Sequence, residues 1–277
     1  MLKMNTPTMD NPLIALLTDF GSADYFVGSL KGAIARVNPR ARTIDITHDV
    51  PSFDVRAAGF TLDACFRFFP EGTIFLSIVD PGVATRRKIL LVRTRTYDFI
   101  APDNGLLTLP LRRQRIREIR HVASPRFFLT AARTTFEGRD RMAPAAAWLS
   151  LGLDPRELGP RLKTFATIDI PRPVCSGRKI LGAVLHIDKF GNIVTNVPAR
   201  MVDGLRRGRT AKHPVISLEG RDIREFRSSY DSPKRGMLFA LPGSLGLIEV
   251  AVREGSAAQM IGAKAGSVVV VSWGRVY

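Results

Sequence analysis

Short apolar runs alternate with helical patterns along the first half of the chain. Apolar residues spaced three and four apart indicate helices, and short continuous apolar runs indicate buried strands. The predicted elements are a strand over 13–17, a helix over 25–37, a strand over 43–46, a helix over 55–69, strands over 74–79, 89–93 and 97–101, and an Ala-rich helix over 139–151 bent at Pro144. This alternation predicts an α/β domain with a mainly parallel sheet covered by helices.

The pattern changes after Gly152. Spaced prolines without apolar periodicity are typical of a linker. Beyond it, short apolar runs divided by Gly, Pro, Asn or Asp predict strands over 179–187, 193–197, 215–218, 237–241, 246–252 and 267–273, and one short helix over 256–261. The predicted organisation is a flexible tail over 1–11, the α/β domain over 12–153, a linker over 154–177, and a smaller all-β barrel-like domain over 178–277.

The composition is that of a globular protein. The chain has 277 residues, 45% of them apolar and 24% charged, which fits two domains at about 150 residues each. No apolar run approaches the roughly 20 residues that span a bilayer, and residues 1–12 lack the pattern of a secretory signal. Cys65 and Cys175 lie in different halves and support neither a disulfide framework nor a zinc site. We therefore expect a cytoplasmic protein without a membrane partner.

The net charge is unusual, because 41 Lys and Arg against 25 Asp and Glu leave +16. Such an excess can attract nucleic acid or an anionic ligand, but it is also found on solvated surfaces. The densest basic runs, 112–120 and 200–212, lack the interleaved aromatic residues on which single-stranded nucleic acid stacks. We favour the solvated surface and expect no nucleic-acid partner.

Three predicted strands end in an acidic turn, at Asp19, Asp80 and Asp103. The carboxyl ends of parallel strands meet at one edge of a sheet, where ligands bind in open α/β folds. Each Asp alone can instead cap a helix or form a turn, since Gly or Pro lies nearby. Three such turns together favour a ligand site.

Motifs of other enzyme classes are absent. The chain has no dinucleotide-binding, P-loop, zincin or serine-hydrolase motif. Asp45, His48 and Asp49 have the chemistry of metal ligands, but no further cluster of such residues accompanies them. We interpret them as local hydrogen-bonding groups and expect no metal.

Ordered motifs cover nearly the whole chain after Pro12. Among them are Thr18-Asp19-Phe20-Gly21, Val79-Asp80-Pro81-Gly82-Val83, Pro102-Asp103-Asn104-Gly105, Gly138-Arg139-Asp140 and Asp188-Lys189-Phe190-Gly191-Asn192. In this order they resemble the S-adenosyl-L-methionine (SAM) hydrolases, the SAM hydroxide adenosyltransferase branch of the fluorinase/chlorinase superfamily. The resemblance implies a homotrimer with each active site between the first domain of one subunit and the second of its neighbour. It also implies attack of water or hydroxide at C5′ of SAM, giving adenosine and L-methionine, with SAM as substrate and no cofactor.

The resemblance assigns catalytic roles in the first domain. Asp80 would hold and activate the water, and Arg87 would orient it; an Arg87 that is only a surface residue would leave Asp80 without its partner. One carboxylate can accept both hydroxyls of a ribose diol, and Asp19 is the matched candidate, with a helix cap as the alternative. Phe20 and Phe136 are candidates to pack on adenosine, although such aromatic residues are more often part of a core.

Two positions depart from the family pattern. Glu137 stands where the resembled hydrolases usually place His, and Ala84 where Gly is common. A carboxylate can accept a proton as an imidazole does and can pair with Arg87, but its charge also opposes that of Asp80. The halide-using relatives generally lack the Asp and Arg pair, so Asp80 and Arg87 favour water over halide.

The second domain supplies the other matched residues. Asp188 would receive the methionine ammonium, and Asn192 would read the adenine edge through its amide. The alternative is a simple hairpin turn over 188–192. The remaining substrate-binding candidates are Ser244, near the methionine carboxylate or ribose, and Glu249 and Val252, on a strand that offers backbone groups to the base.

Three hypotheses follow, in this order of preference. The first is a SAM-cleaving enzyme. The second is a SAM or adenosine sensor that has lost hydrolysis through Glu137. The third is a basic nucleic-acid-binding protein, which only the charge suggests.

Overall fold

The computed structural model describes residues 13–132, 134–206, 214–230 and 234–273. The chain divides into two compact units, Met1–Ile168 and Asp169–Tyr277. The division falls inside the segment predicted as a linker, while the predicted tail over 1–11 lies outside the described residues.

A seven-stranded sheet forms the centre of the first unit. Its strand order is β2-β1-β3-β5-β4-β6-β7, in which the neighbours from β2 to β5 are parallel and those from β5 to β7 antiparallel. The strands are β1 (Leu13–Thr18), β2 (Arg42–Thr47), β3 (Ile74–Ile78), β4 (Ile89–Arg93), β5 (Asp98–Pro102), β6 (Glu118–His121) and β7 (Arg161–Leu162). The predicted parallel core is confirmed, and the carboxyl ends of β1, β3 and β5 share one edge.

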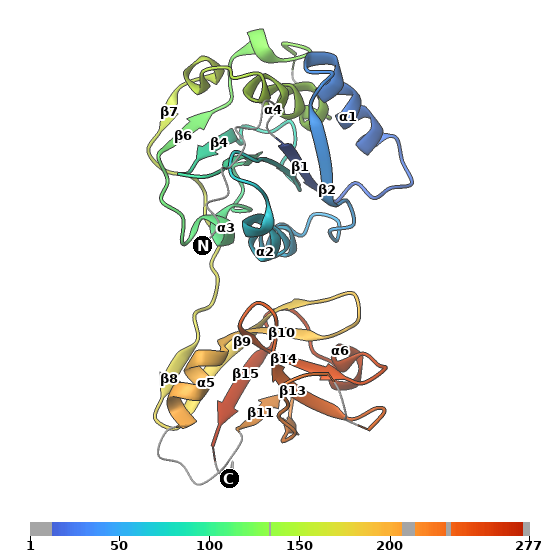
Figure 1. Ribbon diagram of the computed structural model, residues 1–277, viewed down its shortest axis with the longest axis vertical. Coiled ribbons are helices and arrows are strands. Elements are labelled where there is room, and N and C mark those ends of the chain that lie inside the picture. Colours follow the sequence, from blue (N-terminus) through green and yellow to red (C-terminus); the bar gives the residue numbers. More distant parts are fainter. Residues whose placement is uncertain (1–12, 133, 207–213, 231–233, 274–277) are drawn as a thin grey trace, which may run out of the picture. The chain divides into compact units, whose positions relative to one another are not determined.

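Helices cover both faces of this sheet (Figure 1). One face packs against α1 (Phe26–Val37) and α4 (Ala143–Ser150), and the other against α2 (Val55–Cys65) and α3 (Thr108–Leu111). Every residue of β1 is buried, because the strand has an apolar layer on each side. Burial on both faces explains why this strand is a continuous apolar run rather than an alternating one.

Two helices differ from their predicted form. The helix predicted over 55–69 ends at Cys65 and continues as the short 3-10 turn η1 (Phe66–Phe68). The helix predicted over 139–151 consists of a π-helical turn, η3 (Gly138–Met142), followed by α4. Pro144 lies in the first turn of α4, where its missing N–H costs no hydrogen bond, so the irregularity precedes Pro144. Two further 3-10 turns are η2 (Pro125–Phe127) and η4 (Pro155–Leu158).

The second unit is built on an eight-stranded antiparallel sheet that is nearly closed. Its order is β12-β11-β15-β9-β10-β14-β13, with β8 also paired to β9, around one apolar core. The strands are β8 (Val174–Ser176), β9 (Lys179–Ile187), β10 (Ile193–Pro198), β11 (Val215–Leu218), β12 (Arg221–Ile223), β13 (Leu238–Pro242), β14 (Leu247–Val252) and β15 (Val268–Ser272). The barrel-like sheet is confirmed; α6 (Ala257–Ile261) matches the predicted helix, and α5 (Ala199–Arg206) was not predicted.

Candidate active site

A cavity of about 300 Å³ opens at the carboxyl edge of the first sheet. It lies where β1 and β3 end, as the acidic turns predict. Its lining consists of Asp19, Phe20, Phe26, Ser52, Phe53, Ile78, Asp80, Val83, Thr135, Phe136, Glu137 and Gly138. The structure therefore brings together five of the six site residues predicted in this domain, and the sixth, Arg87, contacts two of them.

Asp80, Arg87 and Glu137 form a buried ion-pair network. Arg87 Nε donates to both carboxylate oxygens of Asp80, at 2.8 and 2.7 Å, and Arg87 Nη2 donates to Glu137 Oε2 at 2.5 Å. Burial lowers the pKa of the Arg87 guanidinium, but the hydrogen bonds and charges of both carboxylates outweigh it and raise the pKa. Arg87 is therefore a buried cation between two carboxylates, which rules out the surface-arginine alternative.

Asp19 follows β1 and faces the cavity without capping a helix. Helix α1 begins only at Phe26, and its N-cap residue Tyr25 makes no side-chain cap. Asp19 Oδ2 instead accepts a hydrogen bond from the backbone N–H of Phe53 at 2.8 Å. This contact holds the carboxylate of Asp19 in the lining of the cavity.

Three phenylalanines form an apolar wall of the cavity. The ring centroids of Phe20 and Phe136 are 5.6 Å apart, those of Phe26 and Phe136 5.3 Å, and both pairs are edge to face. Phe26 was not predicted as a site residue, because the first position of an amphipathic helix looks like any core residue. Such a wall suits a flat aromatic ligand.

Three other polar residues singled out in the sequence, Asp103, His48 and Asp45, form contacts within the scaffold. Asp103 Oδ1 accepts from the backbone N–H of Ala166 at 2.6 Å, and Asp103 is not in the lining of this cavity. His48 Nδ1 contacts Thr18 Oγ1 at 2.8 Å, and its Nε2 lies 3.2 Å from Asp45 Oδ1, so these residues brace the end of β1.

A cavity of about 680 Å³ in the second unit gathers most of the remaining predicted residues. Its lining consists of Asp188, Phe190, Asn192, Tyr230, Val252, Arg253, Glu254 and Gly255. Asp188 Oδ1 accepts from the backbone N–H groups of Phe190 and Asn192, both at 2.9 Å, and Asp188 Oδ2 accepts from Asn192 Nδ2 at 2.9 Å. The segment is thus a β9–β10 turn, as the alternative expected, with its carboxylate and amide held at the cavity.

Glu249 is buried beside this cavity with an unpredicted partner. Tyr230 OH donates to Glu249 Oε2 at 2.9 Å. A Cβ on Gly243, in the turn between β13 and β14, would lie 1.8 Å from Glu249 Oε1, so a larger residue there would displace the Glu249 carboxyl group. Ser244, next in this turn, is exposed and does not line the cavity.

Replacing Glu249 with glutamine should stabilise the protein at neutral pH. Burial, helped by the charge of Asp188, raises the pKa of Glu249 although the hydrogen bond from Tyr230 lowers it. The folded state therefore binds the proton more tightly than the unfolded chain, and stability falls as pH rises from about 4.3 through the folded pKa. We expect a higher melting temperature for Glu249→Gln at pH 7.5 and a difference that shrinks towards pH 4 in calorimetry. The exposed Glu71→Gln is the control, and an equal response of both variants would contradict the prediction.

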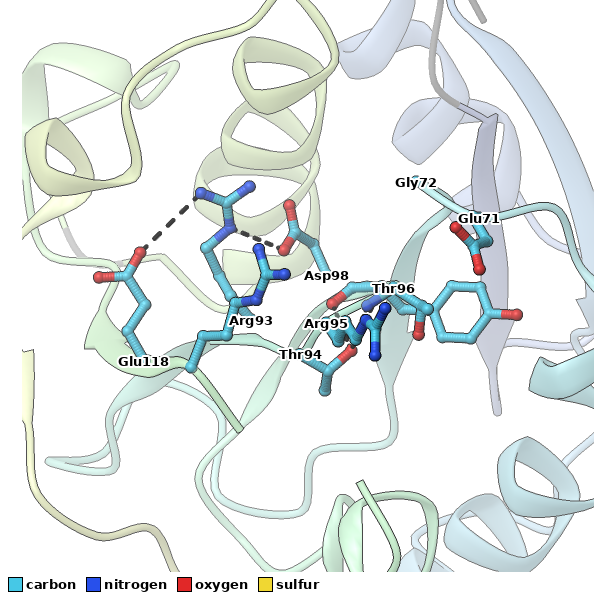
Figure 2. A pocket seen from close by; sticks show the side chains of 10 residues that line it. Glu71, Gly72, Arg93, Thr94, Arg95, Thr96, Asp98 and Glu118 are labelled. Atoms are coloured by element: carbon cyan, nitrogen blue, oxygen red, sulfur yellow. Dashed lines mark hydrogen bonds and ion pairs between the residues drawn. The ribbon is translucent and has the colours of Figure 1, made fainter. Parts of the chain in front are cut away.

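A third cavity, of about 250 Å³, lies at the opposite edge of the first sheet, where β3 and β5 begin (Figure 2). Three of its charged groups pair with each other: Arg93 Nε lies 2.8 Å from Asp98 Oδ1, and Arg93 Nη1 lies 3.9 Å from Glu118 Oε1. None of the predicted site residues lines it. The cavity at the carboxyl edge is therefore the candidate active site.

Within the described ranges, no three His, Cys, Asp or Glu side chains are placed to hold a metal ion. The same residues contain no helix long and apolar enough to cross a membrane. Cys65 is half-buried and Cys175 exposed, and both are free thiols. That the reaction needs no metal stays a prediction.

Comparison with known proteins covers both units. The SAM hydroxide adenosyltransferase N-terminal domain matches residues 14–159, and the C-terminal domain of the same family matches residues 182–270. A (R)-S-adenosyl-L-methionine hydrolase of Thermus thermophilus is 35% identical over 91% of this chain and 96% of its own length, and one of Salinispora arenicola is 32% identical over 95% and 98%.

More distant and structural relatives agree with these matches. A fluorinase of Actinoplanes is 28% identical over 69% of this chain and 73% of its own. The crystal structure of an uncharacterized conserved protein from Thermotoga maritima superimposes with a TM-score of 0.87 at 34% identity, covering 94% of this chain and all of that one. Both domains match in order and over most of their length. The chain therefore belongs to the SAM hydroxide adenosyltransferase family.

Proposed function

We propose that the protein hydrolyses SAM at C5′ to adenosine and L-methionine. The observation that carries the proposal is the buried network of Asp80, Arg87 and Glu137 beside a cavity with an apolar aromatic wall and a second carboxylate, Asp19. The names of the hydrolase relatives support the same substrate.

The reaction requires the protein mainly to position the attacking water and the C5′ carbon of SAM. A water oxygen attacks C5′, the C5′–S bond breaks, and its electron pair returns to sulfur, which leaves as the neutral thioether of methionine. Asp80 holds the water and accepts its proton, while Arg87 fixes the direction of the Asp80 carboxylate. A carboxylate has about four acceptor positions, so Asp80 can bind Arg87 and water together.

Binding roles follow from the same reasoning. Asp19 accepts the ribose hydroxyls, and Phe20 and Phe136 pack on the nucleoside. In the second unit, Asp188 receives the methionine ammonium and Asn192 the adenine edge. The other candidates in that unit are Ser244, Glu249 and Val252. We also infer that the enzyme needs no cofactor. We infer a cytoplasmic location as well, which the two free cysteines support.

Asp19→Ala should weaken adenosine binding by roughly tenfold to a hundredfold, the value of a hydrogen bond to a charged group. The loss should vanish with 2′,3′-dideoxyadenosine, which lacks both hydroxyls. Isothermal titration calorimetry of both ligands against both proteins measures the difference. Equal losses for the two nucleosides would contradict a role at the ribose.

We propose a homotrimer whose sites combine the first unit of one subunit with the second unit of its neighbour. The two sets of site residues lie on separate units, which supports this arrangement. Mixed and reassembled Asp80→Ala and Asp188→Ala proteins should regain activity, because some sites then carry neither substitution. Sedimentation should give a trimer, and a monomer or the absence of regained activity would contradict the proposal.

The decisive test is incubation of the purified protein with SAM, with and without chloride, followed by chromatography. We expect adenosine and methionine in equal amounts and no 5′-chloro-5′-deoxyadenosine. Thermal stabilisation by SAM without any product would favour a sensor instead. Affinity for nucleic acid that falls steeply with salt, without any response to SAM, would favour the nucleic-acid hypothesis.

A further inference from the structure

Glu137 is held by two arginines, of which only Arg87 contacts Asp80. Arg87 Nη2 lies 2.5 Å from Glu137 Oε2, and Arg141 Nη1 lies 3.1 Å from Glu137 Oε1. The Glu137 side chain is only 2% exposed. A carboxylate buried this completely is stable only when its oxygens are paired, and here each oxygen has its own cation.

Arg141 is itself fixed by other contacts. Its Nη2 donates to the carbonyl oxygens of Ala131 and Ala132, at 3.3 and 3.2 Å, and its guanidinium lies 5.0 Å from the ring centroid of Phe128. The side chain is 14% exposed. Arg141 is thus held in place rather than free on the surface, and it loses little conformational freedom by pairing with Glu137.

The backbone around Glu137 has little room to move. Glu137 immediately precedes η3, and Arg141 lies four residues later within that turn. A Cβ on Gly138 would stand 3.0 Å from Ile78 Cδ1, so this segment is pressed closely against β3. The direction of the Glu137 carboxylate therefore depends on its two cations.

The charges balance only when Arg141 is included. Asp80 and Glu137 contribute two negative charges, and Arg87 and Arg141 two positive ones. Without Arg141, two buried carboxylates would share Arg87, and each would compete for its donors. Two carboxylates that share one cation in a buried site repel each other strongly.

We propose that Arg141 is a positioning residue that holds the Glu137 carboxylate against Arg87 and so keeps Arg87 directed at Asp80. The proposal rests on the proposed function of this cavity. It also explains how Glu137 can occupy the position where the resembled hydrolases place histidine. A neutral imidazole requires no second cation, whereas a buried carboxylate requires one.

The test compares kcat and KM for SAM in Arg141→Met, Arg141→Lys and the double variants with Glu137→Gln. Arg141→Met should lower kcat by about 10- to 100-fold, the range for a misplaced catalytic group, and leave KM nearly unchanged. Arg141→Lys should recover part of kcat, because an ammonium can still pair with Glu137. In the Glu137→Gln background, Arg141→Met should cost nothing further. The proposal would be overturned if Arg141→Met lowered kcat equally in the wild-type and Glu137→Gln backgrounds. It would also be overturned if Arg141→Lys lowered kcat as much as Arg141→Met.

Arg67→Met is the matched control. Arg67 pairs with Asp63, four residues earlier, at 2.8 Å and lies 4.8 Å from the ring centroid of Phe66, so it shares the sequence spacing and the types of contact of Arg141, although it is more exposed. Its removal should leave kcat unchanged. A loss of kcat in Arg67→Met equal to that in Arg141→Met would mean that general destabilisation is the cause.

Crystal structures separate this proposal from the proposed function. In Arg141→Met, we expect the Glu137 carboxylate to have left the Arg87 guanidinium, whether or not the wild-type protein turns over SAM. An undisplaced Glu137 would overturn the positioning role. A wild-type protein that forms no adenosine would overturn the proposed hydrolase function but not the positioning role of Arg141.

Discussion

Asp80→Ala is expected to lower kcat for adenosine formation from SAM by about 10²–10⁴-fold, the usual contribution of a positioned general base. Asp80 accepts both hydrogen bonds from Arg87 Nε and lines the cavity where C5′ would lie. Its removal leaves the attacking water without a proton acceptor and leaves Arg87 with Glu137 as its remaining carboxylate partner. Chromatography of adenosine and methionine under single-turnover conditions measures the loss.

The Asp80→Asn variant distinguishes the effect of losing the carboxylate charge from the effect of losing the side-chain volume. The amide keeps the volume of the carboxylate but cannot accept a proton from water, so its kcat should fall nearly as far. SAM affinity, measured by calorimetry, should change little in either variant. An Asp80→Asn protein with near wild-type kcat would show that Asp80 orients the water without accepting its proton.

Gly191→Ala should destabilise the second unit by about 2–5 kcal/mol, the sum of backbone strain and overpacking. Gly191 has φ +82°, and an added Cβ would stand 2.0 Å from Ser256 Oγ and 2.9 Å from Ser256 Cα. Ser256 caps α6 by accepting from the backbone N–H of Gln259, so it cannot retreat without loosening that helix. Denaturant unfolding should reveal the loss, together with weaker SAM binding, because Gly191 forms the turn that holds Asp188.

Gly177→Ala is the control that measures the destabilisation due to backbone conformation without a steric clash. Gly177 has φ +56°, but an added Cβ would meet no atom within 4 Å. This variant should lose about 1 kcal/mol, which is the cost of the left-handed conformation alone. Equal losses in the two variants would mean that the close approach of Ser256 is relieved at no cost.

The sequence is sufficient to predict the parallel core of the first sheet and the position of the cavity, but not the short edge strands β6 and β7. β1 and β3 are apolar runs that end at Asp19 and Asp80, and parallel pairing brings those ends together. The resemblance added Arg87 and Glu137, which are remote in the chain and meet only in the fold. The roles assigned to these residues in catalysis stay predictions.

Other members of the sites depend on tertiary contacts that no pattern along the chain reveals. Tyr230 lies 19 residues from Glu249 in the chain, and the two side chains meet only in the fold. Arg141 looks like one more member of an arginine-rich surface, although its spacing of four from Glu137 was an available signal. Asp103 had the same local pattern as Asp19 and Asp80, yet the backbone of Ala166 occupies it.

The antiparallel strand β4 determines the chemical character of the active edge. Arg87 precedes Ile89, the first residue of β4, and Ile89 pairs with Pro102, the last residue of β5. In an all-parallel sheet, a residue before a strand would lie at the opposite edge from the acidic turns. Because β4 is antiparallel, Arg87 lies at the same edge of the sheet as Asp19 and Asp80, which follow parallel strands. Without this reversal of strand direction, Arg87 would lie at the opposite edge of the sheet, and Asp80 would lack the cation that orients its carboxylate.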